Sequence, residues 1–230
     1  SGMGDSGWRE KYTVADRVDE AKSVANHLGM TKQGRKPFLV CHSYGGSVGL
    51  NAVEMDPESW AGLIVCDMTM LAPGEASDFE THRKKRQERG VQPHRVSENL
   101  EAAKKRFRLA PEQPCKNRYL MDYMAFHSLK EVQGGWVWKF DPRILGPDEE
   151  RGPEWWQSLS DRFAGLALPR AVIYGEHSNM FSRRVAEHIK SKSSDNIPMI
   201  QINDAHHHIM LDQPLAFSAA IDALLQNFRQ

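Results

Sequence analysis

FLVCHSYGGSVGL, residues 38–50, sets a serine between a short apolar run and a segment of small and helix-forming residues. The run 38–41 has the length and composition of a buried strand. Small residues follow Ser43 at positions 45–47, where a helix must pack closely against that strand. The stretch predicts a sharp strand-to-helix turn, at which Ser43 is either a nucleophile or only a turn residue.

A glycine-rich turn of this kind can also bind phosphate. The glycine spacing of G-x-G-x-x-G is absent here, and so is the Gly-Lys-Ser/Thr end of a P-loop. Position 41 is glycine in the G-x-S-x-G pattern of nucleophilic serines and Cys in this chain, a side chain small enough for the turn. The stretch therefore favours a nucleophile.

Apolar runs of strand length recur along the chain, separated by helix-like stretches. They lie at 37–41, 62–67, 170–174 and, more weakly, 199–202. Continuous runs of this kind are typical of parallel strands buried on both faces. Helices are expected over 14–28, which has apolar residues on one face, and from Pro214 to the end. The pattern predicts an α/β fold with a mostly parallel sheet.

Residues 71–160 break this rhythm. The block is basic and helix-prone over 82–108 and rich in Trp, Gly and Pro over 134–156, without a buried-strand run of the earlier kind. We interpret it as a mostly helical insertion that forms a lid. The expected organisation is a first part of the core at 1–70, the insertion at 71–160 and a second part of the core at 161–230.

Composition excludes several classes of protein. The 230 residues carry 30 basic and 30 acidic side chains, so no net field recruits nucleic acid or an acidic membrane surface. No apolar stretch has the length of a membrane span, and the first residues lack a signal-peptide core. Three cysteines without CxxC spacing favour a reducing compartment. We expect a cytoplasmic protein with a small-molecule substrate and no nucleic-acid or membrane partner, and a homo-oligomer is left open.

The basic runs 82–89 and 104–108 are the local exception to this balance. Such runs are typical of solvated helix faces. A sharper interpretation is that they attract an anionic substrate.

DAHHHIMLDQP, residues 204–214, follows the last expected strand. A loop there lies at the carboxyl edge of the sheet, where open α/β sheets place their sites, so a histidine in it can reach Ser43. Adjacent histidines rarely converge on one ion, and the H-E-x-x-H spacing is absent. We expect one histidine to act as a base, with no metal and no cofactor.

In this order the segments resemble those of the α/β-hydrolase superfamily, in particular its capped, esterase-like serine hydrolases. The resemblance covers the chain except the insertion, and it implies a helical cap inserted after the strand that follows the nucleophile helix. SGMGDSGW resembles the loop after the fourth strand, VCHSYGG the nucleophile elbow, AVIYGEHS the strand that often bears the acid, and DAHHHIMLDQP the histidine loop.

The resemblance implies Ser43 as the nucleophile and the backbone N–H of Tyr44 as an oxyanion donor. Alignment on HIMLDQP favours His207 as the base and leaves a shift by one residue open. The expected substrate pocket includes His42, Trp136 and Trp138, although the aromatic side chains of the insertion are equally suited to packing the cap on the core.

The acid departs from the usual pattern. Members of the superfamily usually carry Asp two residues after a Gly-Glu/Asp pair, where this chain has Ser178. Some members take the acid from the end of the strand after the nucleophile helix, where this chain has Asp67. We expect Asp67 to be the acid, with Glu176 as the alternative; Asp67 as a polar residue that merely ends a buried strand stays open.

The resemblance begins at the loop after the fourth strand. The N-terminal strands are therefore expected upstream of Ser1, together with the His-Gly loop that normally gives a second oxyanion donor. We interpret the sequence as a piece of a longer domain.

The leading hypothesis is a serine hydrolase that cleaves a small, largely apolar carboxylic ester through an acyl-enzyme on Ser43. One alternative is hydrolysis of a carbon–carbon bond in a β-diketone-like ring-cleavage product on the same triad. Another is a non-catalytic ligand-binding protein on a hydrolase scaffold, which the absence of the usual acid makes less remote.

Overall fold

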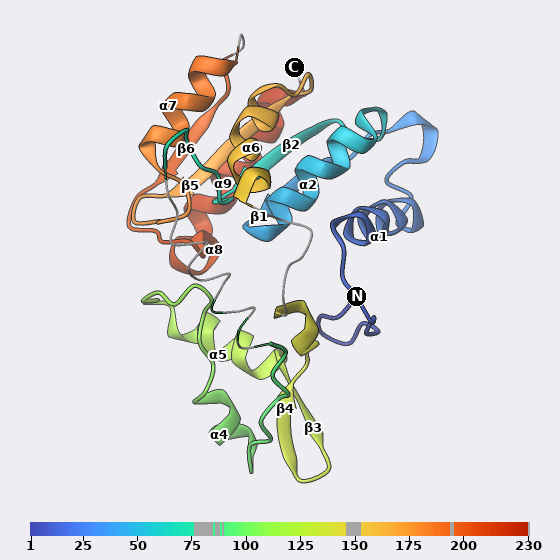
Figure 1. Cartoon of the computed structure of the whole chain (residues 1–230), viewed down its shortest axis with the longest axis vertical. Helices are drawn as coiled ribbons and strands as arrows, with labels where there is room; N and C mark the ends of the chain where they lie inside the picture. Colours follow the sequence, from blue (N-terminus) through green and yellow to red (C-terminus); the bar gives the residue numbers. More distant parts are fainter. Residues whose placement is uncertain (76–84, 86–87, 89, 146–152, 194–195, 230) are drawn as a thin grey trace. The chain divides into compact units, whose positions relative to one another are not determined.

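The computed structural model describes residues 1–75, 85, 88, 90–145, 153–193 and 196–229 (Figure 1). The chain divides into two compact units. The larger unit comprises Val14–Ser77 and Arg151–Gln230, and the smaller comprises Ser1–Thr13 and Asp78–Glu150. The expected division into core and insertion stays a prediction.

The larger unit is built on a four-stranded parallel sheet with the order β1-β2-β5-β6. Its strands are β1 (Phe38–His42), β2 (Gly62–Cys66), β5 (Arg170–Gly175) and β6 (Met199–Ile202). Each apolar run that the sequence analysis identified forms one of these strands, which confirms the α/β fold. β2 is buried along its whole length, whereas β1 lies at the edge of the sheet and its Val40 side chain is exposed.

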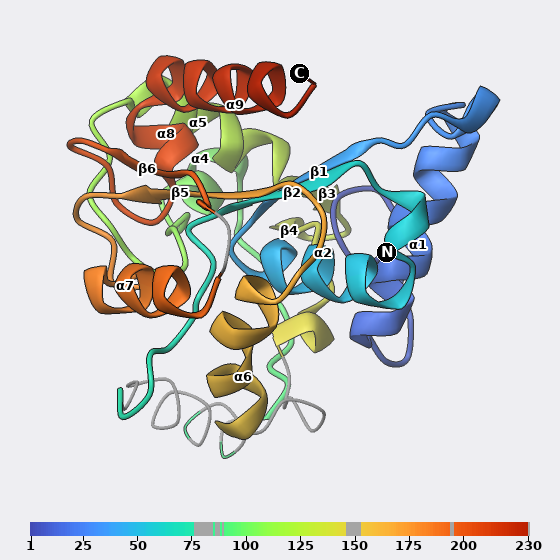
Figure 2. The same ribbon diagram turned by 90° about the horizontal axis from the view of Figure 1, so that it is seen from above.

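Helices cover both faces of this sheet, which explains why its inner strands are apolar on both sides. Figure 2 shows α8 and α9 on one face and α2, α6 and α7 on the other, and α1 packs against α2. The helices are α1 (Val14–His27), α2 (Tyr44–Met55), α6 (Pro153–Ala164), α7 (Arg183–Lys192), α8 (Ile209–Asp212) and α9 (Pro214–Phe228), with short 3-10 turns η1 (Lys32–Gly34) and η2 (Pro57–Ser59). The helices expected over 14–28 and from Pro214 are α1 and α9.

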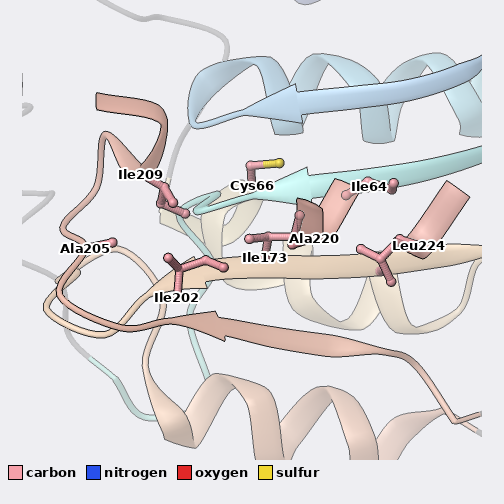
Figure 3. Packing of buried hydrophobic residues seen from close by; sticks show 9 residues of the cluster. Ile64, Cys66, Ile173, Ile202, Ala205, Ile209, Ala220 and Leu224 are labelled. Atoms are coloured by element: carbon pink, nitrogen blue, oxygen red, sulfur yellow. The ribbon is translucent and has the colours of Figure 1, made fainter. Parts of the chain in front are cut away.

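The core between the sheet and α9 consists of aliphatic side chains that point inward from the strands and from the C-terminal helices (Figure 3). Fully burying one such side chain contributes about 1.5–3 kcal/mol relative to leaving it exposed. The cluster comprises Ile64, Cys66, Ala171, Ile173, Ile202, Ala205, Ile209, Ala220 and Leu224.

On the opposite face, α2 approaches β1 and β2 closely because glycines occupy its inward positions. A Cβ added at Gly46 would lie 2.8 Å from the Met68 side chain, and one at Gly49 would lie 2.7 Å from the Cys41 Sγ atom. Cys41 stands where the G-x-S-x-G pattern has glycine. Its thiol fills the space that Gly49 leaves, so the turn tolerates this substitution.

The smaller unit contains a β-hairpin that the interpretation of a mostly helical insertion omitted. Its elements are α4 (Leu100–Lys104), α5 (Arg118–His127), β3 (Leu129–Val132), β4 (Gly135–Trp138) and η3 (Pro142–Leu145). The antiparallel strands are only four residues long, so they lack the continuous apolar run by which buried strands are identified. Trp136 and Trp138 alternate with other residues at a period of two, and this alternation is the sequence feature that indicates β4.

The described part of the helix-prone segment 82–108 departs from a continuous helix. Residues 82–84, 86–87 and 89 lie outside the described residues, and 90–99 contain no helix. Ser97 instead forms an antiparallel bridge with Trp136. A Cβ at Gly135 would collide with the Ser97 carbonyl oxygen, and Gly135 has a φ of +141°, so this close bridge requires glycine.

Hydrogen bonds tie the first residues of the chain to this unit. The Asp141 N–H donates to the Gly2 carbonyl at 2.8 Å, and the Tyr12 hydroxyl donates to the Asp141 carboxylate at 2.6 Å. Asp141 is buried and also pairs with Arg143. The segment SGMGDSGW therefore belongs to the same unit as residues 78–150, which the sequence analysis assigned to the insertion.

Candidate active site

The carboxyl ends of three neighbouring strands meet at one edge of the parallel sheet. His42 of β1 pairs with Cys66 of β2, and Cys66 pairs with Ile173 of β5. Ser43 and Asp67 come directly after the first two of these residues. The Ser43 N–H donates to the Cys66 carbonyl at 2.9 Å, and the Asp67 N–H donates to the Ile173 carbonyl at 2.7 Å. Strand register thus places Ser43 and Asp67 at the ends of two adjacent strands.

Ser43 lies in the sharp turn that the sequence predicted between a strand and a helix. Its backbone has φ 54° and ψ −124°, a region that non-glycine residues adopt at a cost in strain. The Gly46 N–H donates to the Ser43 carbonyl at 2.8 Å, and α2 begins at Tyr44. This geometry presents the serine hydroxyl at the end of β1, beside the amino terminus of a helix.

His207 joins Ser43 to Asp67. Its Nε2 atom lies 2.8 Å from the Ser43 Oγ atom, and its Nδ1 atom lies 2.7 Å from the Asp67 Oδ2 atom. The His207 side chain is 5% exposed and that of Asp67 is 0% exposed, so water does not compete for this pair. A carboxylate at Nδ1 keeps the imidazole proton there and leaves Nε2 to accept from the hydroxyl.

Asp67 is held by groups from β5 and the loop that follows it. The Ser178 hydroxyl donates to the Asp67 Oδ2 atom at 2.5 Å, and the Ser178 oxygen accepts from the Met180 N–H at 3.0 Å. The Gly175 N–H faces the other carboxylate oxygen at 3.4 Å. Ser178 occupies the position at which the acid is usual in similar sequences, and here it bonds to the carboxylate that contacts His207.

Glu176, the alternative acid, is turned to a different partner. Its Oε2 atom accepts from the Asp204 N–H at 2.9 Å, and its side chain is exposed. Glu176, His177 and Asp204 bring three atoms of metal-ligand type within 4.8 Å of one another, all in exposed side chains. The structure brings Asp67 to His207 and leaves Glu176 outside this contact.

The two histidines beside His207 have other neighbours. The His206 N–H and Nδ1 atom both face the Asp212 carboxylate, at 2.8 and 3.1 Å. The His208 ring packs edge-on against His207 with 5.0 Å between centroids, and burial lowers the pKa of His208 to about 4. Of the three consecutive histidines, His207 is the one that reaches Ser43.

His42, expected in the substrate pocket, contacts the histidine loop, and its place in a pocket stays a prediction. Its Nε2 atom lies 2.8 Å from the His207 carbonyl oxygen, and the centroids of the His42 and His207 rings are 4.7 Å apart. Burial lowers the pKa of His42 below its ordinary value. Sequence analysis missed this contact and that of Ser178, because the partners are more than a hundred residues apart and no local spacing links them.

Comparison with known proteins identifies the family. Residues 1–220 match the alpha/beta hydrolase family. The chain belongs to the α/β-hydrolase family. A search of curated proteins gave no match.

Solved structures resemble this α/β-hydrolase in fold. An E-2-(acetamidomethylene)succinate hydrolase has a TM-score of 0.75 and 19% identity, over 98% of this chain and 78% of its own. A thioesterase domain from the curacin biosynthetic pathway has a TM-score of 0.73 and 18% identity, over 98% and 78%. An esterase from Mycobacterium tuberculosis has a TM-score of 0.70 and 20% identity, over 98% and 72%. At these identities the likeness shows the fold.

The other two residues expected in the pocket of this α/β-hydrolase lie in the smaller unit. Trp136 and Trp138 belong to β4 and are half-buried. The Trp138 ring lies 6.0 Å from that of Phe107, and the Trp136 backbone pairs with Ser97. Their place in a substrate pocket stays a prediction.

The basic runs and the cysteines also stood out in the sequence. Lys104 of the second basic run pairs with Asp122 at 2.6 Å, whereas most of the run 82–89 lies outside the described residues. Burial raises the pKa values of Cys41 and Cys66 to about 12, so both thiols stay protonated at neutral pH. Across the described residues, no helix is both long and apolar enough to span a bilayer.

Proposed function

We propose that this α/β-hydrolase is a serine hydrolase that cleaves a small, largely apolar carboxylic ester through an acyl-enzyme on Ser43. The unbroken path of hydrogen bonds from the Ser43 hydroxyl through His207 to Asp67 supports this proposal. A hydroxyl, an imidazole and a buried carboxylate in this order are the groups that acyl transfer needs: a nucleophile, its base and the group that orients the base.

The proposed reaction begins when Ser43 Oγ attacks the ester carbonyl and His207 Nε2 takes its proton. The imidazolium that forms is stabilised by the Asp67 carboxylate. The oxyanion accepts a hydrogen bond from the Tyr44 N–H in the first turn of α2, where the helix dipole is positive. His207 then protonates the leaving alkoxide, and water, activated by the same base, releases the acid from Ser43.

The apolar substrate is proposed from the aromatic content of the insertion. Trp136 and Trp138 in β4 are assigned to the acyl or alcohol side of the pocket, because aromatic rings offer large apolar area to a ligand. His42 is the third residue assigned to the pocket. The segment 71–160 is proposed to be the cap that selects the substrate.

A fluorophosphonate probe tests the nucleophile. The full-length folded protein is expected to be labelled on Ser43, and Ser43→Ala is expected to remove the label. Ser218→Ala is the matched control, since this exposed hydroxyl bonds only its own helix at Pro214. Failure of the full-length folded protein to react would overturn the proposal in favour of a non-catalytic ligand-binding protein.

Substrates distinguish ester cleavage from carbon–carbon bond cleavage. We expect turnover of p-nitrophenyl acetate and butyrate that Ser43→Ala abolishes, with little turnover of a ring-cleavage dienoate. Turnover of the dienoate alone would reject the ester hydrolase.

A further inference from the structure

The imidazole of His42 is a buried polar group to which the proposed reaction assigns no proton transfer. His42 is the last residue of β1, and its backbone is fixed by pairing with Cys66 of β2. The position directly before Ser43 therefore carries a side chain whose origin is set by the sheet.

The hydrogen bond of this ring defines its tautomer. The His207 carbonyl oxygen can only accept, so the His42 Nε2 atom, 2.8 Å away, must donate. His42 therefore carries its proton on Nε2. Burial, the largest influence, lowers the pKa of His42, so the ring is neutral when the His207 imidazolium forms 4.7 Å away.

The sheet order explains what this bond adds. His207 lies in the loop after β6. In the sheet, β2 and β5 lie between β6 and β1. Strand pairing therefore leaves the loop without a direct link to the turn that holds Ser43. The bonds at His207 Nδ1 and Nε2 hold only the ring, and the bond at Nε2 must break and form again during turnover. The hydrogen bond from His42 links the His207 main chain to β1.

We propose, on the basis of the serine hydrolase function above, that His42 is a positioning residue that fixes the His207 loop at the distance that Ser43 requires, by donating Nε2–H to the His207 carbonyl. His42 thereby connects the nucleophile turn and the base loop through one side chain. The ring also packs against that of His207 at an angle of 39° and restricts its rotation. This role is additional to the place in the substrate pocket proposed above for His42.

Two substitutions separate the donor from the ring. His42→Phe keeps a flat ring and removes the donor, whereas His42→Gln keeps a donor in the side-chain amide. Loss of one hydrogen bond that orients a reacting group is expected to lower kcat for p-nitrophenyl butyrate about tenfold in His42→Phe, with KM within about twofold of the wild type. His42→Gln is expected to regain most of that loss.

The matched control is His188→Phe, which removes a histidine hydrogen bond to Asp161 between α7 and α6 in the same unit. This variant is expected to keep the wild-type kcat and KM. Thermal unfolding of all three variants verifies that they are folded.

Two kinetic outcomes would overturn the positioning role. A rise in KM with unchanged kcat in His42→Phe would leave His42 with its pocket role alone and without a positioning role. Equal losses of kcat in His42→Phe and His42→Gln would show that ring shape, and not the hydrogen bond, is what matters.

Amide hydrogen exchange tests the tether independently of turnover. Peptides that cover residues 203–208 are expected to exchange faster in His42→Phe and at nearly the wild-type rate in His42→Gln. If the wild type neither hydrolyses esters nor reacts with the fluorophosphonate, the proposed function fails while exchange still decides whether His42 holds the loop. Unchanged exchange in His42→Phe would overturn the tether.

Discussion

At the scale of single residues, the Asp67 carboxylate supplies the contact that orients the proposed base. Its Oδ2 atom lies 2.7 Å from the His207 Nδ1 atom and accepts from Ser178 as well. Glu176 bonds the Asp204 backbone at the loop surface. Asp67 and Glu176 each follow a buried strand, so their sequence contexts are alike. They differ in the groups that their carboxylates contact.

Replacing each carboxylate by its amide separates their roles. Asp67→Asn is expected to lower kcat for p-nitrophenyl butyrate by about 10⁴-fold, because an amide no longer favours the imidazole tautomer with a free Nε2. Glu176→Gln is expected to leave kcat within about twofold, since its carboxylate touches no reacting group. Steady-state kinetics at pH 7.5 measure both, and the reverse order of effects would assign the acid to Glu176.

The members of this site could be predicted from sequence to different extents. Ser43 lies in a local pattern, and His207 was placed by its position after the last strand and before HIMLDQP. Asp67 was identified because the strand that precedes it is continuous and apolar. The hydrogen bonds of Ser178 and His42 depend on how the loops after β5 and β6 fold over the sheet edge, which no spacing in the sequence encodes.

At the scale of secondary-structure elements, two strand ends approach the same side of His207. The Asp67 Oδ2 atom accepts from both His207 and Ser178, so the end of β2 and the loop after β5 meet at one carboxylate oxygen. We therefore predict that a carboxylate at position 178 can also face the His207 Nδ1 atom and supply the acid when position 67 does not.

Moving the carboxylate tests this equivalence. The double variant Asp67→Asn with Ser178→Asp is expected to recover at least about tenfold of the kcat lost in Asp67→Asn, because a carboxylate again faces the imidazolium. The control pairs Asp67→Asn with Ser178→Asn, which has the same size and no charge, and it is expected to recover nothing. Equal rates for the two double variants would contradict the shared position.

The contact of α2 with the sheet makes a second prediction at this scale. A Cβ at Gly49 would lie 2.7 Å from the Cys41 Sγ atom and 2.9 Å from Leu63, so Gly49→Ala is expected to lower the free energy of unfolding by about 1–3 kcal/mol. Gly45→Ala on the same helix meets no atom within 4 Å and is the control, expected to be neutral or stabilising. Urea unfolding measures both, and equal stabilities would refute the close contact.

Strands and helices could be predicted from sequence where their pattern of apolar residues was long or repeated. The buried strands and the terminal helices were found because each has several apolar residues at one period. The β3–β4 hairpin was missed, because two four-residue strands give too short a pattern. α6 begins in the sequence block 71–160 assigned to the insertion, yet its Leu159 is buried in the larger unit. One of its partners, α2, is about a hundred residues away in sequence, so tertiary packing places α6 in this unit.

At the scale of the larger unit as a whole, the candidate site unites the ends of all four parallel strands. Ser43 follows β1, Asp67 follows β2, Ser178 follows β5 and His207 follows β6. The apolar cluster beneath them holds these ends in place, since it contains Ile202, Ala205 and Ile209 from the segment that leads into and out of the histidine loop. Folding stability and the geometry of the site therefore depend on the same packing.

A buried histidine of this site predicts that acid destabilises the larger unit. Burial, reinforced by the neighbouring His207 and His42, lowers the pKa of His208 from 6.5 to about 4. Between these values the unfolded chain binds a proton that the folded chain excludes, so the free energy of unfolding falls as the pH drops from about 6.5 to 4. The lowered pKa of His42 acts in the same direction. Above pH 7 both states are neutral at these rings, and this contribution is constant.

Replacing the titrating ring should make stability less sensitive to acid. His208→Gln is expected to give a shallower fall in the free energy of unfolding between pH 6.5 and 4 than the wild type, with parallel curves above pH 7, because glutamine binds no proton in this range. Urea unfolding at half-unit pH steps measures the slopes. The exposed His177 provides the control, and His177→Gln is expected to keep the wild-type slope. If His208→Gln also kept that slope, the exclusion of a proton from the His208 ring would not be a source of the acid sensitivity.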